Sequence, residues 1–199
     1  MNQELDTNYR CYHFNNYYLS GIQAGIQAAH AQHRLACKYL QSAIYFEKSK
    51  VDKNGTEEST YLEWLENHET IILLNAGMAK DLEDLVAFFD LPENPFPWAE
   101  WHESKEALNG CITSIAMVLP SRIYENSGVV GPAMKDAPNP GSCYPTRRTG
   151  VEVVKRVDEN INYTGHYDLS IRHSGKILET FSEFEIDLMK RMCNLRLMG

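Results

Sequence analysis

Polar side chains that could bind a ligand or move a proton occur in the segment that begins at Ser20. Gln23 and Gln27 are one helical turn apart and would share a face of a helix, and His30 follows on the same helix. A neutral imidazole can take and return a proton near pH 7, and an amide can read a base edge or a carbonyl. His30 is therefore a candidate general base, with Gln23 and Gln27 as ligand contacts. The alternative is a histidine that holds the helix against a sheet and two solvated glutamines.

A second group of candidates lies between residues 102 and 113. Glu103 could orient an imidazole or activate water, and His102 stands next to it. Asn109 precedes a glycine and is typical of a tight turn, after which the hydroxyl of Thr113 projects from a strand. We consider Glu103 and Thr113 candidate catalytic residues, together with His30, and His102 and Asn109 candidate ligand contacts. The alternatives are a solvated carboxylate and a hydroxyl bonded to the backbone.

A third group lies in a segment rich in glycine and proline. Arg147 and Arg148 follow Tyr144 closely. Guanidinium groups bind phosphates through two parallel hydrogen bonds, and a tyrosine ring can stack on a base. These three residues are candidates for closing over an anionic ligand, although a solvated basic pair is the alternative.

The chain shows no signature of a metal or cofactor. The five cysteines are scattered, and no pair has C-x-x-C spacing. His30 and His33 are three residues apart on one helix, but no acid or third histidine is placed to complete a site. We therefore expect neither a metal nor a cofactor.

The elements that must position these residues alternate between strands and helices. Residues 9–14, 70–75, 97–102 and 111–119 are predicted strands. A helix is predicted from Ser20, its N-cap, with Ile22, Ile26, Ala29, Leu35 and Leu40 near helical spacing. A short helix is expected near residues 61–65 and another at Lys80–Phe89. The pattern predicts an α/β fold with a mixed four-stranded sheet covered by helices.

Two parts of the chain are expected. Residues 1–123 form the α/β domain, and residues 124–199 form an extension packed on the same body. The stretch 126–150 is a candidate lid, followed by strands at 151–157 and 167–172. The last helix starts near Ser182, which makes a capping box with Glu185. The apolar stripe of that helix would dock on the same body or form a homodimer interface.

The distribution of charge limits the class of partner. The net charge is −8, and residues 52–106 alone carry fourteen acids and three bases. Such a surface repels a long polyanion, although acidic surfaces also serve solubility. Neither a membrane-spanning run nor a secretory signal is visible, so we expect a cytoplasmic protein with no membrane partner.

The first helix resembles the corresponding signature of type II peptidyl-tRNA hydrolases. Gln27, His30 and Ala31 fall on the Q-x-x-H-A of that family, and residues 109–113 resemble its P-G-T-x-T turn. The resemblance covers roughly residues 9–120 and extends to divergent relatives that bacteriophages encode. Gln23 stands nearest the family's lysine, and residues 102–104 occupy the region of its aspartate.

The resemblance implies a hydrolase that cleaves the ester of peptidyl-tRNA. The altered positions suggest a second hypothesis, in which the fold binds a small nucleotide-like ligand and either cleaves it or only holds it. In a phage, such a protein could remove a nucleotide signal of host immunity. A protein-binding module that uses the last helix is a third option.

Overall fold

The structure is a computed structural model that describes residues 8–49, 56–124, 126–127, 143–145, 151–157, 167–173 and 176–198. For residues 43–49 and 143–180 within these ranges it describes only the backbone. The chain divides into two compact units, residues 1–121 with 195–199, and residues 122–194. The sequence suggested one extension from 124 to 199, but the last residues return to the first unit. Packing of the extension on the same body stays a prediction.

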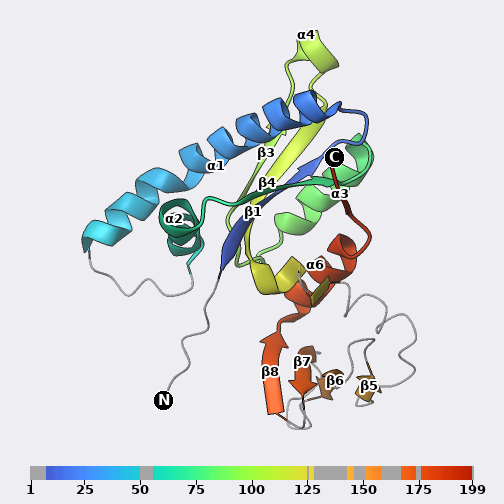
Figure 1. The fold of residues 1–199 in the computed structure, drawn as a ribbon. Coiled ribbons are helices and arrows are strands. Elements are labelled where there is room, and N and C mark those ends of the chain that lie inside the picture. Colours follow the sequence, from blue (N-terminus) through green and yellow to red (C-terminus); the bar gives the residue numbers. More distant parts are fainter. Residues whose placement is uncertain are drawn as a thin grey trace. The chain divides into compact units, whose positions relative to one another are not determined.

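The first unit is α/β, with a mixed open sheet of five strands (Figure 1). Its elements in chain order are β1 (Tyr9–Asn15), α1 (Gly21–Ser49), α2 (Glu57–Asn67), β2 (Ile71–Asn75), α3 (Ala79–Phe89), β3 (Trp98–His102), α4 (Lys105–Leu108), β4 (Ile112–Pro120) and β9 (Arg196–Leu197). The strand order is β3-β4-β1-β2-β9. Strands β1 and β2 are parallel, and the other pairs are antiparallel.

The four strands predicted from the sequence all lie in this sheet, but the expectation of a four-stranded sheet is wrong. The fifth strand, β9, pairs with β2 through Leu197 and Arg196. Both of its residues are exposed. A strand of two exposed residues has no alternation of apolar and polar side chains, so the sequence contains no signal for it.

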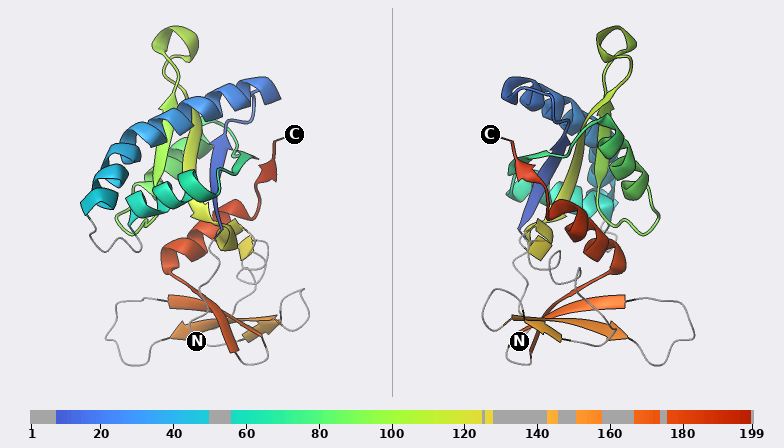
Figure 2. Two further views of the ribbon diagram at one scale, coloured as in Figure 1. Left: turned by 60° about the vertical axis from the view of Figure 1, so that its left-hand side comes forward. Right: turned by 90° about the vertical axis from the view of Figure 1, so that its right-hand side faces the viewer.

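Helices cover both faces of the sheet. On one face, a cluster of buried residues joins α1 and α2 to the sheet, including Leu35, Tyr39, Tyr61 and Trp64. On the other face, Phe14 of β1 packs against Phe89 of α3, with ring centroids 5.4 Å apart. The right-hand view of Figure 2 shows the sheet between α1 and α3. All nine residues of β4 are buried, as expected for a central strand covered on both faces.

Helix α1 contacts the sheet through small side chains rather than through the isoleucines of the predicted stripe. Ala24, Ala28 and Ala31 are buried, whereas Ile22 is 80% exposed and Ile26 is 51% exposed. The two isoleucines therefore do not belong to the buried face of the helix. Alanines one turn apart allow the helix to lie close to the sheet, which turns the isoleucines outward.

The second unit holds an antiparallel sheet with strand order β5-β6-β7-β8 and the helix α6. Its elements are β5 (Cys143–Pro145), β6 (Val151–Val157), β7 (Tyr167–His173), β8 (Lys176–Phe181) and α6 (Glu183–Met192). Strands β6 and β7 match the predicted pair, and β5 and β8 are additional. Strand β5 lies within the candidate lid, and as an edge strand it tolerates Pro145.

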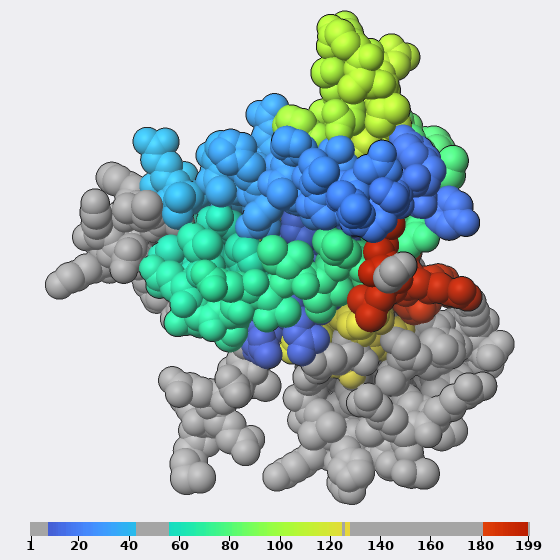
Figure 3. All heavy atoms as spheres, turned by 45° about the horizontal axis from the view of Figure 1, so that its top comes forward, coloured from blue at the N-terminus to red at the C-terminus, as the bar shows by residue number. Residues whose placement is uncertain are grey.

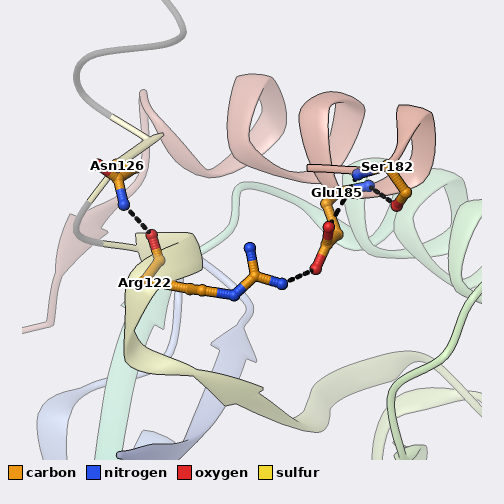
Figure 4. A network of polar contacts seen from close by, with 4 residues as sticks. All are labelled: Arg122, Asn126, Ser182 and Glu185. Atoms are coloured by element: carbon orange, nitrogen blue, oxygen red, sulfur yellow. Dashed lines mark hydrogen bonds and ion pairs between the residues drawn. The ribbon is translucent and has the colours of Figure 1, made fainter. Parts of the chain in front are cut away.

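The capping box predicted for the last helix is confirmed and belongs to a larger network (Figure 4). The backbone N–H of Ser182 donates to the Glu185 carboxylate (2.9 Å), and the N–H of Glu185 donates to Ser182 Oγ (3.2 Å). The same carboxylate is buried and accepts a hydrogen bond from Arg122. The Arg122 guanidinium also lies 4.8 Å from the centre of the Phe181 ring. Glu185 thus caps α6 and neutralises Arg122 at once.

We predict that Glu185→Ala lowers the free energy of unfolding of this unit by about 2–3 kcal/mol, because it removes a charged hydrogen bond and part of the cap. Ser182→Ala is the matched control for the cap alone and should cost about 1 kcal/mol. Denaturant unfolding of both variants gives the two values. Equal losses would show that the Arg122 interaction contributes nothing.

Candidate functional site

Gln23 lies in the first turn of α1, which begins at Gly21, and takes part in its N-terminal cap. Its Oε1 accepts hydrogen bonds from the backbone N–H and the hydroxyl of Ser20, both at 3.0 Å. In return, the backbone N–H of Gln23 donates to Ser20 Oγ (3.3 Å). The predicted N-cap residue is thus engaged in a capping box, and the amide oxygen of Gln23 serves the helix end.

Thr113 and Gln27, both predicted site residues, are in direct contact. Thr113 Oγ1 donates to Gln27 Oε1 at 3.2 Å. The pairing of β3 with β4 shifts register here, with Trp101 opposite Ser114 and His102 opposite Ile112. Thr113 is therefore the extra residue of a bulge, and a bulge can re-aim a side chain toward a neighbouring layer. Because Thr113 is fully buried, its hydroxyl anchors α1 and does not face solvent.

His30 is exposed and lies flat on a tryptophan. The rings of His30 and Trp101 are stacked, with centroids 4.5 Å apart and planes 17° apart. The guanidinium of Arg34, one turn further along α1, is 5.4 Å from the centre of the same tryptophan ring. His30 therefore belongs to a row of basic side chains resting on aromatic rings of β3.

The residues between 102 and 111 form the loop around α4. Asn109 and Gly110 both adopt left-handed backbone conformations, with φ of 52° and 74°, and form the tight turn expected from the sequence. His102 Nδ1 lies 3.0 Å from the carbonyl oxygen of Gly110, so it donates there, and Nε2 lies 3.4 Å from Glu100 Oε1. With Nδ1 as the donor, Nε2 carries a proton only in the imidazolium form.

Glu103 lies in a different environment from His30. Its backbone N–H donates to the carbonyl of Cys111 (3.0 Å). Next to it, the pKa of Tyr18 is raised to about 12, by the hydrogen bond to Cys111, by partial burial, and by the negative charges of Cys111 and Glu103. Among the described residues, no hydrogen bond, ion pair or ring contact joins His30, Glu103 and Thr113 to one another. The three predicted catalytic residues therefore do not form one reacting centre in this conformation.

The third predicted group is largely outside the described residues. Tyr144 lies in β5, where its backbone pairs with Val153. Arg147 and Arg148 lie outside the described residues, and so does most of the candidate lid.

A cavity that the sequence did not reveal lies beside the edge strand β3. Its volume is about 570 Å³. One wall belongs to α1 and contains Arg34, Cys37 and Lys38. The edge strand contributes Trp98, Ala99, Glu100 and His102, and Asp90 closes the cavity at the end of α3. A volume of this size suits a small organic ligand.

Both cations of this cavity are held by aromatic rings. Lys38 Nζ donates to the carbonyl of Trp98 (3.2 Å) and lies 5.0 Å from the ring centres of Trp98 and Tyr39. Arg34 lies over Trp101, as described above. His30, Arg34 and Lys38 follow one another every fourth residue, and the chain has no acidic residue between Asp6 and Glu47. That gap in negative charge is the sequence signal that could have located this surface. Figure 3 shows the start of α1, in blue, along the face turned toward the viewer.

Beneath the first half of α1, the sheet carries a layer of buried polar side chains. His13, Asn15 and Ser114 are fully buried. Asn15 of β1 stands opposite Ser114 of β4 in the register of the two strands. His13 Nδ1, Asn15 Oδ1 and Ser114 Oγ have no hydrogen-bond partner among the described residues. Buried polar groups without partners oppose folding, so this layer is a weak part of the contact between α1 and the sheet.

The described part of the chain contains no group of three or more histidine, cysteine, aspartate or glutamate residues arranged to hold a metal ion. None of its helices is long and apolar enough to cross a membrane.

Comparisons of the chain with protein-family models, with curated proteins and with solved structures found no match. The resemblance to type II peptidyl-tRNA hydrolases stays a prediction.

His13 should make stability depend on pH. Burial lowers its pKa from 6.5 to about 4, and the hydrogen bond with Gln32 opposes this shift. The unfolded chain therefore takes up the proton first, and stability falls as pH drops from about 6.5 toward 4, by about 2–3 kcal/mol at pH 4.5. His13→Gln should remove this component. Urea unfolding at pH 7 and pH 4.5 tests it, and an equal loss in wild type and variant would contradict it.

Gly25 offers a second test. A Cβ at this position would meet nothing within 4 Å, so the site has room for a side chain. Gly25→Ala should raise the free energy of unfolding by up to about 1 kcal/mol, because alanine favours the helix. Ala29→Gly, at an exposed position of α1, should lower it by a similar amount. Thermal or urea unfolding measures both, and a destabilising Gly25→Ala would refute the reasoning.

Proposed function

We propose that this protein binds a small nucleotide-like anion in the cavity between α1 and β3, on a fold related to type II peptidyl-tRNA hydrolases. The observation that carries the proposal is the pairing of Arg34 and Lys38 on one wall with Trp98 on the strand opposite. Guanidinium and ammonium groups bind phosphate oxygens, and an indole ring offers a stacking surface for a base.

The charge around the cavity favours a small ligand over a long polyanion. Arg34 and Lys38 share the cavity with Asp90 and Glu100, so its fixed charges balance when His102 is neutral. Residues 52–106 carry an excess of eleven negative charges. A tRNA needs many phosphate contacts across a wide surface, whereas a nucleotide needs only a few local cations.

Binding has more support than hydrolysis. Thr113 is buried against Gln27, and His30 is stacked on Trp101. Chemistry at Thr113 would need α1 to move away from the sheet, and the His30 ring would have to leave its stack on Trp101. A protein that holds a signal nucleotide without cleaving it would still withdraw it from host immunity in an infected cell. Hydrolysis of the nucleotide or of peptidyl-tRNA is therefore an outcome to be measured.

Calorimetric titration with a panel of linear and cyclic nucleotides tests the proposal. We expect Arg34→Ala and Lys38→Ala each to weaken binding by about 1.5–3 kcal/mol, because each removes a charged hydrogen bond. Lys80→Ala is the matched control, since it removes one exposed cation from the start of α3. Binding to wild type should depend weakly on salt, with a slope of about −0.7 to −0.9 for each of one to three phosphate contacts.

The same titrations with peptidyl-tRNA distinguish the alternative. Tight, steeply salt-dependent tRNA binding that ignores Arg34 and Lys38 would reject the proposal and favour the hydrolase. Chromatography of the mixtures shows whether ester or phosphate bonds are cleaved. Arg147→Ala and Arg148→Ala, included in the series, test whether the predicted lid contributes to affinity.

A further inference from the structure

The wall of the cavity opposite its two cations is acidic. Glu100 and Asp90 both line the cavity that contains Arg34 and Lys38. Glu100 Oε1 lies 3.4 Å from His102 Nε2, so a ligand base would replace or share this contact. Glu100 lies two residues after Trp98 on β3, so the two side chains leave the strand on the same side. A phosphate bound by Arg34 and Lys38 would therefore leave the rest of the ligand near the tryptophan and the carboxylate.

Asp90 occupies a position where helix stability disfavours a negative charge. It is the C-cap of α3, and its backbone N–H donates to the carbonyl of Val86 (2.9 Å). The carboxyl end of a helix carries partial negative charge, so a cation is preferred there. The last turn of α3 contains no basic residue. This carboxylate therefore has no role in stabilising its helix, which leaves it available to a ligand.

From these observations we infer that Glu100, assisted by Asp90, selects guanine among the bases of the nucleotide; the inference rests on the proposed function. A carboxylate can only accept hydrogen bonds. Guanine presents two adjacent donors, N1–H and the N2 amine. Adenine and cytosine place an acceptor beside their amine, and uracil places its single N3–H between two carbonyls. A carboxylate thus attracts the Watson–Crick edge of guanine and repels the acceptor atoms on the Watson–Crick edges of adenine, cytosine and uracil.

Titration of the protein with GMP, IMP and AMP isolates the base, because the three share one phosphate and one ribose. We expect GMP to bind about 10- to 100-fold more tightly than AMP, which is the discrimination of a good bidentate contact. IMP keeps N1–H and lacks the amine, so it should fall between them. Glu100→Gln should bring the ratio of GMP to AMP affinity close to one, and Asp90→Asn should reduce it. Glu83→Gln, on the exposed side of α3, is the matched control and should leave the ratio unchanged.

Each other result has a definite meaning. Equal affinity for GMP and AMP would overturn the guanine inference and leave the proposed function standing. Failure of the whole nucleotide panel to bind would overturn the proposed function and the inference together. A guanine preference that survives in both carboxylate variants, with unchanged unfolding midpoints, would overturn the role of Glu100 and Asp90. Weaker binding of 2′-deoxy-GMP than of GMP in wild type, absent in Glu100→Gln, would assign the carboxylate to the ribose and overturn its role toward the base.

Discussion

The contact between α1 and the strands β1, β4 and β3 positions the two cations of the cavity against the edge strand β3. Its chemical character changes along the helix. From Ala31 to Tyr39, α1 packs on an apolar cluster that includes Cys11 and Val118. Nearer its start, Gln27 meets Thr113, and the layer beneath is polar. Packing of the apolar half fixes the position of α1 relative to the sheet, so that Arg34 and Lys38 reach the edge strand β3. The polar half adds less stability, so local opening is expected to begin there.

Much of the fold could be predicted because its elements carry strong local patterns. The apolar run at 70–75 and the capping signals at Ser20 and Ser182 each determine structure within a few residues. The errors arose where structure depends on distant partners. Strand β9 exists because β2 offers it an unpaired edge, and β5 exists because β6 lies beside it. The burial of Ala24 in place of Ile22 depends on how closely the helix approaches the sheet.

The candidate site could be predicted only in part, and for a related reason. The sequence identified Gln27 and Thr113 as separate candidate site residues, but it could not show that they bond to each other between α1 and the sheet. The cavity brings together residues of α1, the end of α3 and β3. No spacing of residues along the chain predicts that these three elements lie next to one another. The weak signal that existed was the absence of acids between Asp6 and Glu47, because it leaves the cations of α1 unopposed on their own helix.

The way these cations are held bears directly on how the site could bind an anion. A lysine or arginine side chain ordinarily loses considerable rotational entropy when a ligand immobilises it. Lys38 is already placed by the Trp98 carbonyl and two aromatic rings, and Arg34 by Trp101. Cation–π contacts are weaker than hydrogen bonds to a phosphate. A bound anion can therefore shift the two cationic groups by a short distance while the rest of each side chain stays ordered. The aromatic residues of β3 therefore lower the entropic cost of binding even where they do not touch the ligand.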